Sequence, residues 1–380
     1  MMKKRVLIIN PTYLPGYKAG GPQQTIQNIC EVYKEKADIY LLTLNHDMGE
    51  LDVYSYPTNQ WIDLYGIKIM YVSDKEFGFR LFEKMYRDYD TILACGLFCK
   101  STIKMMLLKK NDHKQLFVAP MGVFSKNALK VNSIKKKLFL NAFSLMGVFK
   151  KCIWSFTTEE ELSEAKETIG VKNIVNFIIA EDLPRAVDFD AQKERLNCRN
   201  DVLRIIFLSR IVLKKNLLQA IKILTHPFEG AIIFDIYGLK EDQDYWKQCE
   251  EAMIGLPINI ICKYCGSIKP EESIKAFEEH DIFLFPTLGE NYGHVIFESL
   301  AAGCLPIISN TTPWKDLDDN QCGNIFDLED IQGFRNCIKD YIEMPRDVLI
   351  RRKNNAIDYA EKKYRTSINT SGYSNIFLLD

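Results

Sequence analysis

The sequence predicts an α/β protein built from two successive doubly wound domains. Short, continuous apolar runs, such as those at residues 5–10 and 203–209, are typical of parallel strands that are buried on both faces. Each run leads into a loop and then into a helical pattern of apolar residues, and this order recurs along the chain. The length of 380 residues is sufficient for two domains of ordinary size.

The N-terminal half begins with the strand pattern at residues 5–10. A glycine-containing loop follows, and the spacing of apolar residues then predicts a helix from Gln24 to about Lys34. Three further apolar runs are predicted strands of the same sheet: residues 37–45, 91–96 and 115–120.

The polar, charged stretch at residues 187–201 is interpreted as the linker between the domains. After it, five apolar runs are predicted strands: residues 203–209, 231–238, 258–266, 281–286 and 305–309. We therefore expect an N-terminal domain over residues 1–186 and a C-terminal domain over residues 187–361, with a C-terminal helix at about 362–380 packed back on the first domain. In such sheets ligands bind outside the carboxyl ends of the strands, so the site is expected in the cleft between two facing domains.

Composition excludes several classes of protein. With 49 basic and 50 acidic residues the chain has no overall attraction for nucleic acid, so no nucleic-acid partner is expected and any anion site must be built locally. The eleven scattered cysteines indicate a reducing, cytoplasmic location, and the single C-x-x-C of Cys262 and Cys265 predicts buried structural thiols rather than a zinc site. The N-terminal apolar run is too short for a signal peptide, and no run of about 20 apolar residues is present.

Residues 285–310, FPTLGENYGHVIFESLAAGCLPIISN, combine a predicted strand end, two acids and a bare glycine. A helix is predicted to begin around residues 291–293, where free N–H groups and the helix dipole favour an anion such as phosphate. Gly293 lets the backbone approach such a ligand closely. The carboxylate of Glu298 can accept hydrogen bonds from two adjacent sugar hydroxyls. An acid that merely complements the helix dipole would explain Glu290, but neither Glu298 nor Gly293.

Two basic residues, Arg210 and Lys215, follow the predicted strand at residues 203–209. Two such residues in a loop more often form a solvated surface. Opposite a helix N-terminus on a neighbouring strand, however, they form a clamp that holds a diphosphate and neutralises it as a leaving group. Gly20 and Gly21, after the first strand, fit neither the dinucleotide fingerprint nor a P-loop, but their backbone can lie against a phosphate or sugar.

Together these motifs resemble those of the retaining family 4 glycosyltransferases, which have the GT-B fold. Arg210 and Lys215 are similar to the R-x4-K pair of that family, and Glu290 and Glu298 are similar to its E-x7-E motif. The Gly-Gly loop and the runs LAAGCLPIIS and DIYGLKEDQDYW also match. APMGVFSKNAL resembles a segment, often written PRGML, of a polysaccharide-building subgroup. The similarity covers most of the chain.

The resemblance implies a catalytic set of three residues: Arg210, Lys215 and Glu290. It also implies seven donor-binding residues: Gly20, Gly21, Ile268, Gly293, His294, Val295 and Glu298. The two basic residues would bind the diphosphate, Glu298 the ribose, and Glu290 would lie near the transferred sugar. The amides at 293–295 would lie near phosphate or sugar, Ile268 near the nucleobase, and the Gly-Gly loop would close on the donor.

The chain departs from the family pattern at three places. Residues 91–100 lack the histidine that contacts the donor sugar in many members, and Met121 replaces the arginine of the subgroup. TTPWKDL, at residues 311–317, stands where many relatives have a glycine-rich turn followed by glutamate. These differences affect the contacts expected to the sugar and the acceptor.

The resemblance implies transfer of a hexosyl unit from a UDP- or GDP-sugar to a saccharide or lipid-linked saccharide, in surface polysaccharide or glycoconjugate synthesis. The anomeric configuration would be retained, and neither a metal nor a cofactor would be needed. Two alternatives stay open: a nucleotide-sugar epimerase of the same architecture and a non-catalytic sugar-nucleotide binding protein. A nicotinamide oxidoreductase is disfavoured because the dinucleotide fingerprint is missing.

Residues 134–156 are basic and apolar by turns, and two interpretations stay open. An amphipathic helix on the inner face of a membrane would suit a lipid-linked acceptor. The alternative is an ordinary helix packed on the sheet with lysines at its solvated ends.

Overall fold

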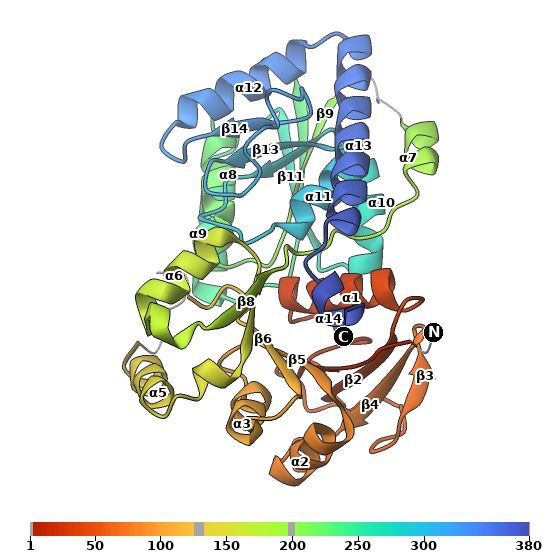
Figure 1. The fold of residues 1–380 in the computed structure, drawn as a ribbon. Helices are drawn as coiled ribbons and strands as arrows, with labels where there is room; N and C mark the ends of the chain where they lie inside the picture. Colours follow the sequence, from red (N-terminus) through yellow and green to blue (C-terminus); the bar gives the residue numbers. More distant parts are fainter. Residues whose placement is uncertain (1–2, 125–132, 197–201, 380) are drawn as a thin grey trace. The chain divides into compact units, whose positions relative to one another are not determined.

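The computed structural model describes residues 3–124, 133–196 and 202–379. The chain forms two compact units, Met1–Leu183 with Ser367–Asp380 and Pro184–Thr366. Each unit has its own sheet with helices packed on it (Figure 1). The α/β class that the apolar runs predict is therefore confirmed. Within the described ranges, no helix is both long and apolar enough to span a bilayer.

The N-terminal unit contains an eight-stranded sheet in the order β3-β4-β2-β1-β5-β6-β7-β8. Its strands are β1 (Arg5–Ile9), β2 (Asp38–Leu44), β3 (Ile62–Leu64), β4 (Ile67–Val72), β5 (Thr91–Cys95), β6 (Gln115–Ala119), β7 (Ile153–Phe156) and β8 (Asn176–Ile179). All pairs are parallel except β3–β4. Its helices are α1 (Gly21–Tyr33), α2 (Phe79–Asp88), α3 (Lys100–Leu108), α5 (Ser133–Leu145), α6 (Glu159–Ile169) and α14 (Ser374–Phe377). Two single-turn helices, η1 (Phe149–Lys151) and η2 (Val171–Asn173), complete the unit.

The C-terminal unit contains a parallel six-stranded sheet in the order β11-β10-β9-β12-β13-β14. Its strands are β9 (Val202–Leu208), β10 (Ala231–Tyr237), β11 (Ile260–Gly266), β12 (Ile282–Phe285), β13 (Leu305–Ser309) and β14 (Asn324–Phe326). Its helices are α7 (Phe189–Arg195), α8 (Leu217–Leu224), α9 (Gln243–Met253), α10 (Ser273–Glu278), α11 (His294–Ala301), α12 (Ile331–Glu343) and α13 (Arg346–Asn369), with single turns η3 (Leu213–Lys215) and η4 (Pro270–Glu272). The direction of strand addition reverses between β9 and β12, which is where doubly wound sheets bind ligands.

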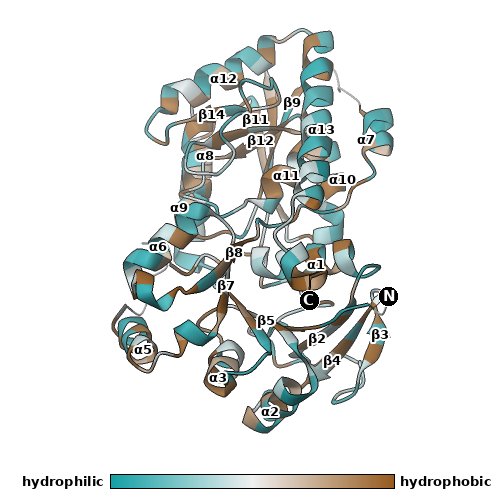
Figure 2. Ribbon diagram, viewed as in Figure 1, coloured by the Kyte–Doolittle hydropathy of each residue, from teal (hydrophilic) through white to brown (hydrophobic). Residues whose placement is uncertain are grey.

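Strands β1, β2, β5, β6 and β9 to β13 follow the predicted apolar runs because most of their side chains are buried, whereas β3, β4, β7, β8 and β14 were not predicted. Residues 6–9 of β1 and 282–285 of β12, for example, are fully buried. Figure 2 shows the hydrophobic positions concentrated on the strands, whereas α12 and α13 alternate between hydrophilic and hydrophobic residues. A helix that packs one face on a sheet requires this alternation.

Residues 187–201, interpreted from the sequence as the linker between the domains, contain a helix that the sequence analysis did not predict. Helix α7 occupies Phe189–Arg195, and the carboxylate of Asp188 caps it by accepting a hydrogen bond of 3.1 Å from the N–H of Ala191. Phe189 is buried and packs against Tyr364, with ring centroids 5.8 Å apart. The polar composition concealed this helix because a single apolar anchor holds it. Residues 197–201 lie outside the described ranges.

The expected C-terminal helix at about 362–380 is also corrected. Helix α13 ends at Asn369, and a separate short helix, α14, covers Ser374–Phe377. A Cβ atom on Gly372 would lie 1.9 Å from the carbonyl oxygen of Ile179, so the chain between the helices lies directly against backbone after β8. A continuous helix would carry its side chains into that backbone.

Residues 134–156 do not form one helix, although both interpretations of this segment, at a membrane surface or packed on the sheet, assumed one. Helix α5 ends at Leu145, and η1 and β7 follow it. The aromatic residues Phe143, Phe149 and Trp154 are buried in the core of the N-terminal unit. They are therefore core side chains and not part of an exposed apolar surface.

Replacing Phe377 tests how strongly α14 stabilises the N-terminal unit. Phe377 is fully buried and stacks on Tyr33, with ring centroids 4.8 Å apart. We expect Phe377→Ala to destabilise this unit by about 3–5 kcal/mol in chemical denaturation, because it leaves a large cavity. The control Leu379→Ala removes a side chain that is 56% exposed, and its effect should stay within about 0.5 kcal/mol. Equal effects of the two substitutions would contradict this account.

Candidate functional site

The site predicted in the C-terminal unit lies on the loops that follow β9 and β12. These strands are parallel neighbours, so their carboxyl ends meet at one edge of the sheet. Backbone and side-chain hydrogen bonds join the two loops. The N–H of Leu288 donates to the carbonyl of Lys214 at 2.9 Å, and Nδ2 of Asn216 donates to the carbonyl of Pro286 at 2.8 Å. The two loops therefore hold their functional side chains in a defined relation.

Lys215 and Glu290 form a largely buried ion pair. The Nζ of Lys215 lies 2.7 and 2.8 Å from the two carboxylate oxygens, and the hydroxyl of Thr287 lies 2.9 Å from Oε1 of Glu290. Only 13% of the lysine side chain and 9% of the glutamate side chain are exposed. The sequence assigned these residues to different contacts of the donor, whereas the structure pairs them.

Two further basic residues, Lys214 and Arg210, act on Lys215 in addition to its partner Glu290. Burial lowers the pKa of Lys215, the positive charges of Lys214 and Arg210 lower it further, and Glu290 opposes both effects. A lowered pKa means that the charged ammonium costs free energy in this environment.

Arg210 pairs with Glu241, a residue that the sequence analysis did not select. Nη1 of Arg210 lies 3.1 and 3.3 Å from the carboxylate oxygens of Glu241, in the loop after β10. The arginine side chain is 41% exposed, so this pair is weak and can exchange for a ligand. The signal in the sequence that could have identified Glu241 was its position after β10, because β10 is the neighbour of β9 in the sheet.

Helix α11 presents its N-terminus at the same edge of the sheet. The first intrahelical bonds run from the N–H groups of Ile296 and Phe297 to the carbonyl of Gly293, so the amides of residues 293–295 precede them. Gly293 has a positive φ of 83°, and a Cβ atom there would lie 3.0 Å from Ile296 and 3.4 Å from Trp314. The glycine is thus needed for the helix start itself as well as for ligand approach.

Trp314, within the divergent segment at residues 311–317, supports this helix start. Its Nε1 donates a hydrogen bond of 2.6 Å to the carbonyl of Tyr292, and its ring meets the Tyr292 ring edge-on at 5.6 Å. The tryptophan is 4% exposed. From the sequence, this segment was expected only to change contacts to the sugar and the acceptor. The packing of Trp314 on Tyr292 was not predictable, because the two residues are 22 positions apart in the chain.

Two titratable groups on α11 have displaced pKa values. Burial and the positive charge of Lys215 lower the pKa of His294 to about 4, so the imidazole is neutral at pH 7. Four residues later on the same helical face, burial raises the pKa of Glu298 to about 7, although Arg185 and the hydroxyl of Ser273 oppose this shift. Ile268 is partly buried in the loop after β11, the loop that leads to Ser273.

The Gly-Gly loop, Gly20 and Gly21, belongs to the N-terminal unit. Gly20 caps α1 with a φ of 64°, and its carbonyl accepts hydrogen bonds of 3.1 Å from the N–H groups of Gln23 and Gln24. A Cβ atom on Gly21 would meet nothing within 4 Å. The turn therefore requires a glycine at 20, whereas the fold of this unit places no such demand on residue 21.

Cys262 and Cys265 on β11 are partly buried free thiols, rather than fully buried as predicted. Within the described ranges, no three His, Cys, Asp or Glu side chains gather as potential metal ligands.

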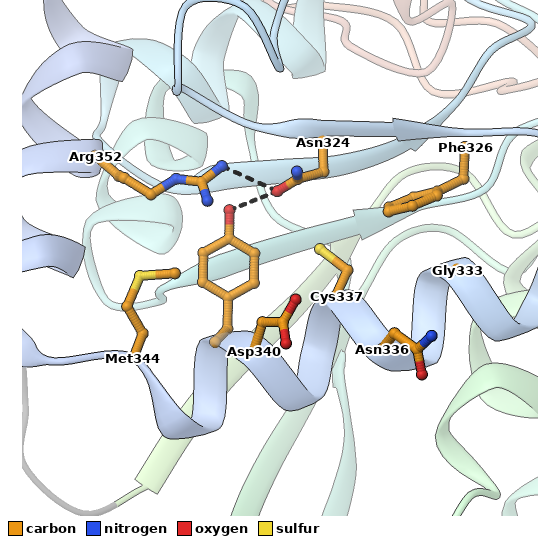
Figure 3. A pocket seen from close by; sticks show the side chains of 9 residues that line it. Asn324, Phe326, Gly333, Asn336, Cys337, Asp340, Met344 and Arg352 are labelled. Carbon is orange, nitrogen blue, oxygen red and sulfur yellow. Dashed lines mark hydrogen bonds between the residues drawn. The ribbon is translucent and has the colours of Figure 1, made fainter.

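A pocket also opens at the far edge of this sheet, between β14, α12 and α13 (Figure 3). There the carboxamide oxygen of Asn324 accepts hydrogen bonds from Tyr341 at 2.8 Å and from Arg352 at 3.0 Å. None of the residues predicted for the donor site lines this pocket.

Comparison with known proteins adds a family to this geometry. Residues 188–363 match the family model described as "Glycosyl transferases group 1". The match covers most of the C-terminal unit, including Lys215, Glu290 and Glu298. No curated protein matches the chain.

Several solved structures share the fold along nearly the whole chain. Anabaena HepE in complex with UDP and glucose has a TM-score of 0.68 at 15% identity, covering 96% of this chain and 97% of that one. WaaG, a glycosyltransferase involved in lipopolysaccharide biosynthesis, has a TM-score of 0.60 at 10% identity, covering 97% and 98%. An E. coli structure bound with UDP-2-fluoro glucose has a TM-score of 0.65 at 11% identity, covering 96% and 97%. The predicted GT-B fold is thus confirmed.

The ionisation of Glu298 should make the stability of the C-terminal unit depend on pH. Its pKa is about 7 in the folded protein and about 4.5 as a free side chain. The unfolded chain therefore releases this proton first, and stability falls as pH rises from about 4.5 to 7. In Glu298→Gln this loss should disappear, leaving the variant on the order of 3 kcal/mol more stable than the wild type above pH 7.

Calorimetric melting of both proteins between pH 4.5 and 8 measures the difference. Glu250→Gln, at an exposed position on α9, should follow the wild-type curve at every pH. A constant offset between Glu298→Gln and the wild type would show that the carboxyl group is not titrating in this range.

Proposed function

We propose that the protein is a retaining glycosyltransferase that moves a hexosyl unit from a UDP- or GDP-sugar to a saccharide or lipid-linked saccharide acceptor. The place of this reaction would be the synthesis of a surface polysaccharide or glycoconjugate. The observation that carries the proposal is the grouping of the largely buried Lys215 with Arg210 at the topological switch point and beside the N-terminus of α11. The match of residues 188–363 to the model "Glycosyl transferases group 1" and the fold shared with HepE, which was solved with UDP, support it.

Each site residue has a role in this proposal. Arg210 and Lys215 would exchange their glutamate partners for the donor diphosphate and stabilise it as it leaves. The exchange frees Glu290, which Thr287 still holds, to face the transferred sugar. The carboxylate of Glu298 would accept hydrogen bonds from the ribose hydroxyls. No metal is assigned a part in these steps.

Residues 293–295 and Ile268 would complete the donor contacts. The amides of Gly293, His294 and Val295 would donate to phosphate or sugar oxygens, and Ile268 would lie near the base. Neutral His294 can donate or accept a hydrogen bond without adding charge. Gly20 and Gly21 would contribute backbone from the N-terminal domain, which spans about residues 1–186 in this proposal, while residues 187–361 hold the donor.

Release of nucleoside diphosphate from a panel of nucleotide sugars tests the reaction. The wild type should release UDP or GDP with one donor, and release should increase with a suitable saccharide acceptor. Lys215→Ala should lower kcat/KM by about 10²–10³-fold or more, because a main stabilising charge on the leaving group is lost. Lys222→Ala, at an exposed position on α8, is the matched control and should keep full activity.

Three outcomes would favour the alternatives or contradict the clamp. Tight nucleotide binding without release from any donor indicates a binding protein, and a changed sugar configuration without transfer indicates an epimerase. Near-normal activity of Lys215→Ala would reject the diphosphate clamp. Since that variant leaves Glu290 buried and unpaired, the double variant Lys215→Met/Glu290→Gln removes both charges and provides a folded, inactive comparison.

We also propose that α5 brings the protein to a membrane surface. Three large apolar side chains of this helix lie on one face and are exposed: Ile134 at 74%, Leu138 at 66% and Leu145 at 89%. Exposed Lys135 and Lys137 lie on either side of that face, while Leu140 and Phe143 on the opposite face are buried. An exposed apolar stripe flanked by lysines fits a surface of anionic lipid. A lipid-linked acceptor would be present at such a surface.

Sedimentation with phosphatidylglycerol-containing vesicles tests this surface. The wild type should bind these vesicles more strongly than phosphatidylcholine vesicles, and salt should weaken the binding. Leu138→Glu/Leu145→Glu should reduce the bound fraction at least severalfold, because it places charges in the apolar face. Ile258→Glu changes a fully exposed residue of the C-terminal unit and should have no effect. Equal binding of both variants would contradict the assignment.

A further inference from the structure

Arg185 connects two parts of the donor site that are far apart in the sequence. Its Nη1 lies 2.6 Å from the carbonyl oxygen of Pro270, 3.5 Å from the hydroxyl of Ser273 and 4.0 Å from Oε1 of Glu298. Pro270 and Ser273 lie in and next to the loop after β11, whereas Glu298 lies on α11. All four residues belong to the C-terminal unit.

The two kinds of contact have different strengths. The bond to the Pro270 carbonyl is short and fixes the guanidinium, whereas 4.0 Å is too long for a hydrogen bond to Glu298. Arg185 therefore acts on the carboxylate through its charge. Because the Glu298 side chain is only 8% exposed, solvent screens that charge weakly.

Arg185 also affects the hydrogen bond that Ser273 can offer. The Ser273 hydroxyl lies 2.8 Å from the same Pro270 carbonyl and is also close enough to Glu298 to lower its pKa. One hydroxyl proton can serve only one of these acceptors at a time. Because Arg185 satisfies the carbonyl, Ser273 can turn its proton to the carboxylate without leaving the carbonyl unpaired.

We propose that Arg185 is a positioning residue for nucleotide recognition: it holds the loop after β11 against α11, favours the carboxylate form of Glu298 and keeps that carboxylate oriented toward the two ribose hydroxyls of the donor. This assignment rests on the proposed function, since it presumes that Glu298 binds the ribose. Arg185 itself contacts no donor atom in this account. Its removal should weaken only the part of the affinity that depends on the ribose hydroxyls.

The other charged groups near Glu298 do not replace Arg185. On α10, which packs against α11, Lys275 is exposed and Glu278 pairs with Arg195 at 3.4 Å. Strand β13, also packed on α11, carries no titratable side chain. On α11 itself His294 is neutral near pH 7. Among the described residues, Arg185 is the cation that opposes the effect of burial on Glu298.

The test compares UDP and GDP with their 2′,3′-dideoxyribose analogues by isothermal titration calorimetry. For the nucleotide that the wild type prefers, Arg185→Gln should weaken binding about tenfold, the loss of one charge-assisted interaction. The affinity of Arg185→Gln for the dideoxy analogue should stay within about twofold of the wild-type value. This change is smaller than the loss of one charge-assisted interaction would cause. Arg185→Lys keeps the charge and should recover part of the lost affinity. Arg195→Gln removes an exposed arginine of α7 and is the matched control.

A double-mutant cycle separates positioning from a general structural role. Glu298→Gln should lose the same ribose-dependent affinity, and Arg185→Gln/Glu298→Gln should lose little more than either single variant. The ratio of the affinity for the nucleotide to the affinity for its dideoxy analogue should also increase with pH as Glu298 ionises. The increase should occur around pH 7 in the wild type and at higher pH in Arg185→Gln. Phosphate titration cancels in this ratio because both ligands carry the same diphosphate.

The possible failures can be told apart. If the wild type binds neither nucleotide, the proposed function is overturned and this assignment with it. If Arg185→Gln weakens UDP and the dideoxy analogue equally, or if the double variant shows additive losses, the proposed function stands and the positioning role is wrong. Melting temperatures identify a variant that has not folded, and Arg185→Lys then decides the question.

Discussion

The positive charge of Lys215, largely withdrawn from water, is the constraint on which the rest of the candidate site depends. A buried ammonium is tolerated only with a close partner, and Glu290 supplies one at 2.7 Å. That geometry requires the loops after β9 and β12 to be joined, which Asn216 does by its hydrogen bond to the carbonyl of Pro286. Asn216 adopts a left-handed conformation to end one turn of helix and begin α8. The ion pair is thereby held in a fixed backbone frame.

Beyond this pair, α11 combines two further properties of the site. Its first amides favour an anion, and a crowded left-handed glycine supported by Trp314 sets where they point. One turn apart on its face, His294 and Glu298 are displaced in opposite directions, the first toward the neutral base and the second toward the neutral acid. Burial causes both shifts, because it disfavours whichever form is charged. A site of this kind responds strongly to the charge of its ligand.

Much of the fold was predictable because each buried parallel strand is also a continuous apolar run. β1, β9 and β12 were found in this way, and the helix start at Gly293 followed from the glycine and the apolar spacing after it. Two features that the sequence analysis did not predict, the helix in the linker and the break in the C-terminal helix, share one cause. Helix α7 depends on a single apolar anchor, Phe189, and the break before α14 depends on the backbone of Ile179. Neither contact leaves a local pattern in the sequence.

The sequence by itself determined the class of fold and the chemical types at the site: basic residues after β9, two acids after β12, and a glycine at the start of α11. Apolar periodicity and motif spacing are local properties, so the chain carries them without reference to its fold. Only the tertiary structure decided which charges meet. Lys215 with Glu290, Arg210 with Glu241, and Arg185 beside Glu298 are pairs separated by 31 to 113 residues along the chain. Their energies arise from burial and distance, which exist only once the strands lie side by side.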